Sequence, residues 1–377
     1  MEKITKIITT EERKPKERNS NMEVLRIIAM FLIVLSHYTV HNGVNNILLP
    51  FGINRLLLEL VSLGNIGSIL FIFISGYYLI DSQKVKLSKL FRLWFQVFFY
   101  AIGFYIIFIL LDKKTFSLGE LKDVLFPITF QRYWFASVYV VMYLFHPYLN
   151  KLINSLNKKE HLNLIFLGIF LFSLLSALTL GVYSYYANQL IQFFLFYIIG
   201  SFFRKYDLKL FNNKKNCWLI LIFTALLMII SVLVLDVLGT KVHFIAKHSM
   251  YFFDRTSVLA ILLSTCIFNL FKNSRKFYNS TINKIAGCMF GVYLISDNYL
   301  VREYLWMDLF KNARYVDSNI LVLHMFGCVF LTMIVCVIID YLRMSAIKVI
   351  CKDRVAKFLD KMQNKISQKV FQDKYYE

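Results

Sequence analysis

The stretch Asn19–Gly43, NSNMEVLRIIAMFLIVLSHYTVHNG, carries the decisive pattern of this 377-residue chain. Glu23 and Arg26 precede or enter a dense apolar run, and His37 and His41 follow it, one helical turn apart. Such a run, entered from a basic leader, is typical of a membrane-spanning helix that starts on the cytoplasmic side. At about 1.5 Å per residue, Arg26 and His37 lie roughly 16 Å apart, which places His37 about halfway through the hydrocarbon.

An ionisable side chain at that depth is costly, and its presence indicates a functional site. The alternative is a neutral imidazole that is hydrogen-bonded between helices. Imidazole titrates near neutrality, so it suits a general base that takes a proton from a hydroxyl, or a nucleophile that carries an acyl group. We therefore predict that His37 is catalytic, and we expect His41 near the interface in a supporting role.

The composition excludes a soluble protein. Hydrophobic residues make up 58% and aromatic residues 17% of the chain, which indicates an all-α polytopic membrane protein in contact with lipids. The net charge of +20 follows from the Lys and Arg of cytoplasmic loops, so we expect no nucleic-acid partner. No small-residue cleavage site follows the first apolar run, so no removable signal peptide is expected. The six cysteines form no CxxC pair, and neither a disulfide framework nor a metal site is expected.

Apolar segments and loop charges predict about ten transmembrane helices with both termini in the cytoplasm. The leader and every second loop are rich in Lys and Arg, whereas the other loops are sparser in charge or balanced by acids. The predicted spans are approximately residues 24–41, 61–80, 93–111, 134–150, 162–181, 188–203, 217–238, 255–271, 285–300 and 319–341.

Three regions follow from this scheme: a cytoplasmic leader (1–22), an integral membrane domain (23–342) and a cytoplasmic tail (343–377). The tail repeats apolar residues at helical spacing with lysines on other faces, which predicts a cationic amphipathic helix on the inner leaflet. The chain has neither a Walker A loop nor a GxGxxG motif, which argues against a nucleotide-driven pump and a dinucleotide enzyme.

Several residues are given structural roles. Gly64, Gly67 and Gly76 are expected to let helices approach closely. Tyr133 and Trp134 are expected in the interfacial aromatic belt, with sugar stacking as the alternative. Four further histidines are assigned to packing, to hydrogen bonds between helices or to a solvated loop: His146, His243, His248 and His324.

Four segments, in the right order along the chain, resemble the acyltransferase-3 family of membrane acyltransferases. Arg26 and His37 match its R-x10-H pattern, with Glu23 as the preceding acid. Lys89 and Arg92 stand where the family usually shows Arg-x-x-Arg. The other matching segments are LFIFISGYYLI (70–80), RYWFASVYVVMYLFHPYLNKLI (132–153) and GCMFGVYLISDNYLVREYLW (287–306).

The resemblance implies a multi-pass enzyme of the cell membrane, in bacteria the cytoplasmic membrane. Such an enzyme transfers an acetyl group from cytoplasmic acetyl-CoA to a hydroxyl of a surface polysaccharide or its lipid-linked precursor. Acetyl-CoA is then a co-substrate, no cofactor is bound permanently, and other glycan-assembly proteins are candidate partners. The residues implied are His37 for catalysis; Arg26, Lys89 and Arg92 for the donor phosphates; and Glu23, His41, Trp134, Ser296 and Asp297 in support.

Two positions depart from the family pattern. Lys89 replaces an arginine and loses the bidentate fork of the guanidinium. Ser296 stands where many relatives have histidine, so that role is vacant or taken by Asp297. The alternatives are a catalytically inactive family member and a transporter or flippase of a lipid-linked glycan. A transporter should carry ionisable residues at several mid-span positions. The sequence leaves open the acceptor, the acyl group and the oligomeric state.

Overall fold

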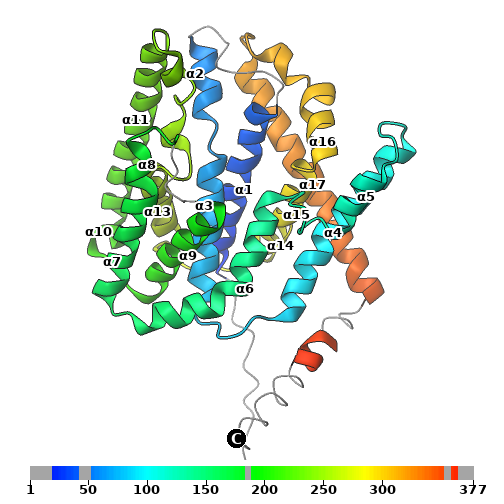
Figure 1. Ribbon diagram of the computed structural model, residues 1–377, viewed down its shortest axis with the longest axis horizontal. Helices are drawn as coiled ribbons and strands as arrows, with labels where there is room; N and C mark the ends of the chain where they lie inside the picture. The colour runs from blue at the N-terminus through cyan, green and yellow to red at the C-terminus, as the bar shows by residue number, and fades with distance from the viewer. Residues whose placement is uncertain (1–18, 42–51, 183–187, 352–357, 364–377) are drawn as a thin grey trace, which may run out of the picture.

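The computed structural model describes residues 19–41, 52–182, 188–351 and 358–363, and all regular elements in these ranges are helices (Figure 1). The α-helices are α1 (Ser20–Val40), α2 (Ile53–Leu60), α3 (Gly64–Leu79), α4 (Leu87–Leu110), α5 (Leu118–Leu125), α6 (Trp134–Ser155), α7 (Lys158–Ile169), α8 (Leu175–Ala177), α9 (Gln189–Lys205), α10 (Lys209–Asn212), α11 (Lys214–Gly239), α12 (His243–Ala246), α13 (Val258–Lys272), α14 (Ser280–Gly287), α15 (Met289–Ser296), α16 (Tyr299–Glu303) and α17 (Leu321–Cys351). Short π or 3-10 turns link some of them: η2 (Phe170–Leu174), η3 (Tyr251–Phe253), η4 (Tyr304–Leu309) and η5 (Asn312–Tyr315).

Seven helical segments in the described ranges are long and apolar enough to cross a membrane. They are Ser20–Val40, Ile53–Leu79, Leu87–Leu110, Lys158–Ala177, Lys214–Gly239, His243–Lys272 and Leu321–Ala346. Three predicted spans fall outside this set. For the predicted span 134–150, helix α6 carries the polar residues His146 and Asn150. For 188–203, helix α9 is only 17 residues long, and the span 285–300 is interrupted between α14 and α15. The chain is therefore an all-helical multi-pass membrane protein, while the count of ten remains a prediction.

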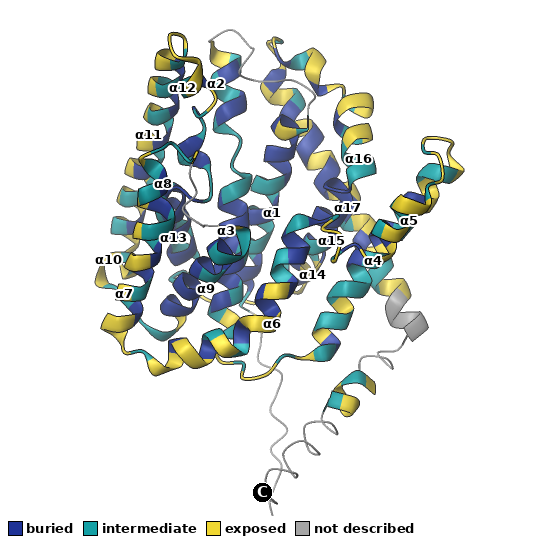
Figure 2. Cartoon of the chain, viewed as in Figure 1, coloured by how far each residue is buried: buried dark blue, intermediate teal, exposed yellow. Residues whose placement is uncertain are grey.

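Helix α1 lies inside the bundle and packs against α3, α13, α14, α15 and α17 (Figure 1). Two glycines of α3 let helices approach closely, as predicted: Gly67 lies against α1 and Gly76 lies against α9. A Cβ atom on Gly67 would lie 2.3 Å from the Ala29 carbonyl oxygen, and one on Gly76 would lie 2.3 Å from that of Tyr197. Buried residues concentrate on α1, α3 and α9, whereas the outer helices α4 and α11 expose many side chains (Figure 2).

The loops that the sequence assigns to the cytoplasm gather at one end of the bundle, where α1 begins. Asn21 donates to the backbone carbonyls of Ser274 and Arg275, 3.1 and 2.7 Å away. Arg204 pairs with Asp81 at 3.3 Å, and Lys272 pairs with Asp207 at 2.6 Å. The basic loops thus share one side, while the orientation of that side in the membrane stays a prediction.

The tail differs in part from its predicted boundary. Helix α17 continues through Cys351, so the helix that was predicted to end near residue 341 runs further. Of the predicted tail 343–377, residues 343–351 continue α17 and residues 358–363 are also described, whereas the rest of the tail and residues 1–18 of the leader lie outside the described residues. Within residues 358–363, Gln363 accepts a hydrogen bond from the Leu87 amide at 3.1 Å, which ties the tail to the start of α4.

Candidate active site

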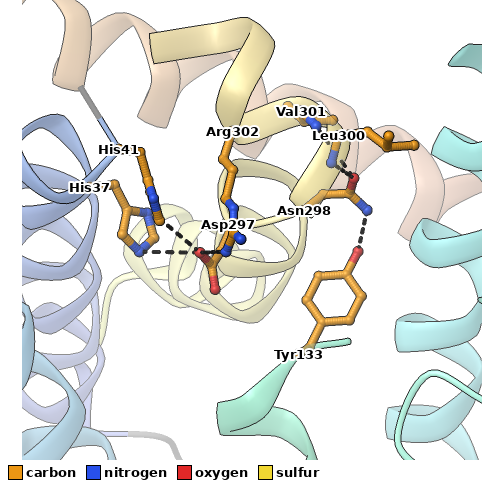
Figure 3. Close-up of polar contacts among 8 residues, drawn as sticks. All are labelled: His37, His41, Tyr133, Asp297, Asn298, Leu300, Val301 and Arg302. Carbon is orange, nitrogen blue, oxygen red and sulfur yellow. Dashed lines mark hydrogen bonds and ion pairs between the residues drawn. The ribbon is translucent and has the colours of Figure 1, made fainter. Parts of the chain in front are cut away.

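The predicted span 285–300 does not form one continuous helix, because the helical structure is interrupted at Cys288 and again at Asp297. Helix α15 ends at Ser296, and Asn298 caps the next helix by accepting from the Leu300 amide at 3.0 Å. The Asn298 side chain also donates to the Tyr133 hydroxyl at 2.6 Å (Figure 3). A capping side chain favours a new helix start over continuation. The break leaves Asp297 between two helices, where its carboxylate faces α1.

His37 of α1 and His41, the residue that follows its end, converge on this carboxylate (Figure 3). His41 Nε2 lies 3.3 Å and His37 Nε2 lies 3.9 Å from the same oxygen, Asp297 Oδ1. The imidazole rings have centroids 5.2 Å apart, as their spacing of one turn requires. Arg302 from α16 approaches the same oxygen at 3.6 Å. The buried cluster therefore contains two imidazoles, one carboxylate and one guanidinium.

The charges of this cluster favour proton transfer. Asp297 is 7% exposed and His37 8% exposed, so both lie in a low-dielectric environment. Arg302 offsets the carboxylate charge, and the carboxylate in turn stabilises an imidazolium that forms when a histidine accepts a proton. His37 lines the neighbouring cavity, and its buried Nδ1 has no hydrogen-bond partner among the described residues. This arrangement can perform general base catalysis or nucleophilic catalysis.

The same three side chains also have the chemistry of metal ligands. The ligand atoms of His37, His41 and Asp297 lie within 4.8 Å of one another. Two imidazoles and a carboxylate suit zinc or another transition metal. The expectation of a metal-free site therefore remains a prediction.

A cavity of about 360 Å³ opens beside the cluster. Its volume lies in the range of roughly 300–1,000 Å³ that is usual for small-molecule sites. It extends from His41 along α1 to Met30, a distance of about 16 Å at the helical rise per residue. Trp134 and Arg255 line the wall contributed by α6 and the loop before α13. The cavity thus leads from the end of α1 toward the end that carries Arg26.

A family model described as an acyltransferase domain matches residues 19–341, which is most of the chain. The chain belongs to the acyltransferase-3 family. It is therefore a membrane acyltransferase by family, as the resemblance of its motifs predicted. No curated protein and no solved structure matches it significantly.

The residues that this acyltransferase was predicted to use for its donor lie near the end at which α1 begins. Arg26 forms an ion pair with Glu23, which is buried. Lys89 and Arg92 are exposed and lie one turn apart at the start of α4. The Arg26 side chain is 26% exposed, so a ligand can contact it although it is paired with Glu23.

The remaining predicted site residues are also placed. Ser296 is fully buried, and its hydroxyl has no hydrogen-bond partner among the described residues, whereas Asp297 reaches the cavity. The assignment of Tyr133 to an aromatic belt is wrong, because that residue is 2% exposed and bonded to Asn298. The predicted hydrogen bond between helices is confirmed for His324, whose Nδ1 lies 2.9 Å from the Tyr38 hydroxyl.

Sequence reasoning missed two arginines, Arg302 and Arg255. Arg302 lies in a stretch where basic residues are balanced by acids, and its contact with Asp297 depends on the break after α15. The sequence places Arg302 five residues after Asp297, but only the helical turn of α16 brings the two side chains together. Arg255 follows an acid in a loop and carries no sequence signal for the cavity that it lines.

Proposed function

We propose that this acyltransferase transfers an acetyl group from cytoplasmic acetyl-CoA to a hydroxyl of a cell-surface polysaccharide or its lipid-linked precursor. The observation that carries the proposal is the convergence of His37 and His41 on the buried Asp297 at the wall of the cavity. The family supplies the class of reaction, and the cluster supplies the groups that such a reaction needs.

In the proposed reaction, His37 acts as the general base. It takes the proton of the acceptor hydroxyl while the hydroxyl oxygen attacks the thioester carbonyl carbon. Asp297 stabilises the imidazolium that forms, and His41 holds the carboxylate in place through its contact at 3.3 Å. The bond from carbon to sulfur then breaks, and the imidazolium returns its proton to the leaving thiolate. The products are the acetyl ester and coenzyme A.

The cavity supports a donor that enters from the end where α1 begins. Met30, at its lower limit, is four residues from Arg26, which is about 6 Å along the helix. Arg26, Lys89 and Arg92 would bind the phosphates of coenzyme A through charge-assisted hydrogen bonds. The long arm of the donor would then reach along α1 to His37, so that the acetyl group crosses the membrane core and the nucleotide does not.

Transport of a lipid-linked glycan is less well supported. Buried ionisable residues do occur elsewhere in the bundle, but they pair with one another. Arg55 lies 2.5 Å from Asp236, and Asp340 accepts from Arg343 at 2.7 Å and from Tyr100 at 2.7 Å. These contacts hold helices together, whereas the histidine cluster lines a cavity.

Replacement of Arg92 by Glu tests the donor site. We expect Arg92→Glu to weaken acetyl-CoA binding by at least about tenfold, because a carboxylate repels the phosphates that the guanidinium would bind. Lys84→Glu is the matched control, since this exposed lysine lies in the loop just before α4 and its replacement makes the same charge reversal. The measurement is equilibrium binding of acetyl-CoA. Equal losses of affinity in both variants would show a non-specific effect of charge and would contradict a phosphate-binding site at Arg92.

Sealed vesicles that hold the full chain test the reaction itself. Radiolabelled acetyl-CoA is supplied only on the side where α1 begins, and the surface glycan of the producing organism only on the other side. We expect labelled acetyl esters on the glycan, released by mild alkali. Label that stays on the donor side, or that appears only when the vesicles are permeabilised, would contradict transfer across the membrane.

A further inference from the structure

A second cavity, of about 400 Å³, adjoins the first through one side chain, Arg255. It lies among the segment after α8, the start of α9 and the loop between α12 and α13. Arg255 lines both cavities, so the two spaces meet at its side chain. Among the described residues, no other one lines both cavities.

Arg255 is held in a defined position by an aromatic ring. Its guanidinium carbon lies 4.4 Å from the centroid of the Trp134 ring, which is within cation–π distance. Trp134 itself is packed edge-to-face against Phe135 and Phe193, with centroids 5.7 and 6.2 Å away. One face of the indole is therefore occupied by the guanidinium, and Trp134 acts as a platform for Arg255.

No carboxylate of the described residues lies within ion-pair distance of this guanidinium. The adjacent Asp254 is engaged with Thr256, which donates its amide and its hydroxyl to one carboxylate oxygen, each at 2.8 Å. Lys247 adds a second cation to the wall of the second cavity. In contrast, Arg132, also stacked on an aromatic ring at 4.5 Å, pairs with Asp123 at 2.7 Å.

A stacked guanidinium without a close carboxylate, placed where two cavities meet, is suited to bind an anion. We propose that Arg255 binds an anionic group, a carboxylate or a phosphate, on the acceptor of the proposed acetyl transfer. The acceptor is then an acidic saccharide or polyol phosphate that enters through the second cavity. Its anion contacts Arg255, and its hydroxyl reaches His37 across the first cavity. This inference rests on the proposed function for the acceptor role, but the binding site can be tested without it.

Calorimetric titration of the full chain in lipid nanodiscs tests the site. The ligands are trigalacturonate, its neutral counterpart galactotriose, and a trimer of glycerol phosphate. We expect the wild-type chain to bind at least one of the anionic ligands at least about tenfold more tightly than galactotriose. Comparison of trigalacturonate with the glycerol phosphate trimer then shows whether the site prefers a carboxylate or a phosphate.

Three variants make the result specific to Arg255. Arg255→Gln should remove the preference for the anion and leave galactotriose binding unchanged. Arg255→Lys, which keeps the charge but loses the planar fork, should retain part of the preference and shows that the site still folds. Arg132→Gln is the matched control, because it removes a stacked arginine outside both cavities, and it should keep the full preference.

Equal binding of all three ligands by the wild-type chain would overturn the proposal. So would a preference that survives Arg255→Gln in a chain that elutes as a single species, or one that Arg132→Gln also removes. Because calorimetry needs no acetyl transfer, a chain that binds the anion but transfers no acetyl group would refute the proposed function and leave this site standing. A chain that transfers acetyl groups without preferring an anion would refute the anion site and leave the proposed function standing.

Discussion

The variant His37→Gln is expected to lose at least about 100-fold in the rate of acetyl transfer, because it removes the general base. Glutamine keeps one hydrogen-bonding group of similar reach but takes up no proton at neutral pH. A histidine with a purely structural role would instead lower the stability of the fold by about 1–3 kcal/mol and reduce the amount of inserted protein. The measurement is acetate incorporated into the glycan, divided by the amount of inserted protein.

The neighbouring histidine supplies the matched control for this experiment. His41→Gln removes an imidazole one turn away that contacts the same carboxylate oxygen. We expect a smaller loss, because His41 Nε2 lies in hydrogen-bond range of Asp297 and its role is to hold that group. A His37→Gln variant that inserts normally and transfers at nearly the wild-type rate would end the assignment and move the catalytic role to His41.

Replacement of Asp297 by Asn should cost between about 10²- and 10⁴-fold in rate, the range seen when a carboxylate behind a catalytic histidine is neutralised. Asparagine preserves the shape but no longer stabilises the imidazolium, and it leaves the positive charge of Arg302 without its partner 3.6 Å away. The expected loss is in the rate at saturating acceptor, with acetyl-CoA binding unchanged.

The comparison with Asp340→Asn separates catalysis from folding. Asp340 is also buried and also accepts from an arginine, but it lines neither of the two cavities. Its replacement should lower stability and leave the rate per inserted molecule near the wild-type value. Equal losses of rate per molecule in the two variants would assign Asp297 a structural role.

The sequence predicted the parts of the fold that depend on local composition. Apolar runs marked the helices, and the positions of Gly67 and Gly76 indicated close packing, which their distances from neighbouring carbonyl oxygens confirm. The spacing of His37 and His41 predicted that they share one helix face. These features follow from periodicity and residue size, which a single segment carries in full.

The rest of the site depends on contacts between distant segments. The apolar run 285–296 gives no sign that the helix ends before Asp297. The break there involves Asn298, which caps the next helix and also donates to Tyr133, 165 positions away along the chain. The exposure of Tyr133 was misjudged for the same reason: an aromatic residue at a span end is usually interfacial, but here a buried amide holds it. Arg255 and Arg302 lie in or after loops, and only the tertiary fold brings them to the cavity.

Mass spectrometry of the surface glycans tests whether this chain acetylates them through His37. Glycans are compared from cells that have the gene, cells that lack it, and cells that carry only His37→Gln at an equal level of inserted protein. We expect acetyl mass on the glycan in the first case and its loss in the other two. Identical acetyl content in all three would contradict this expectation.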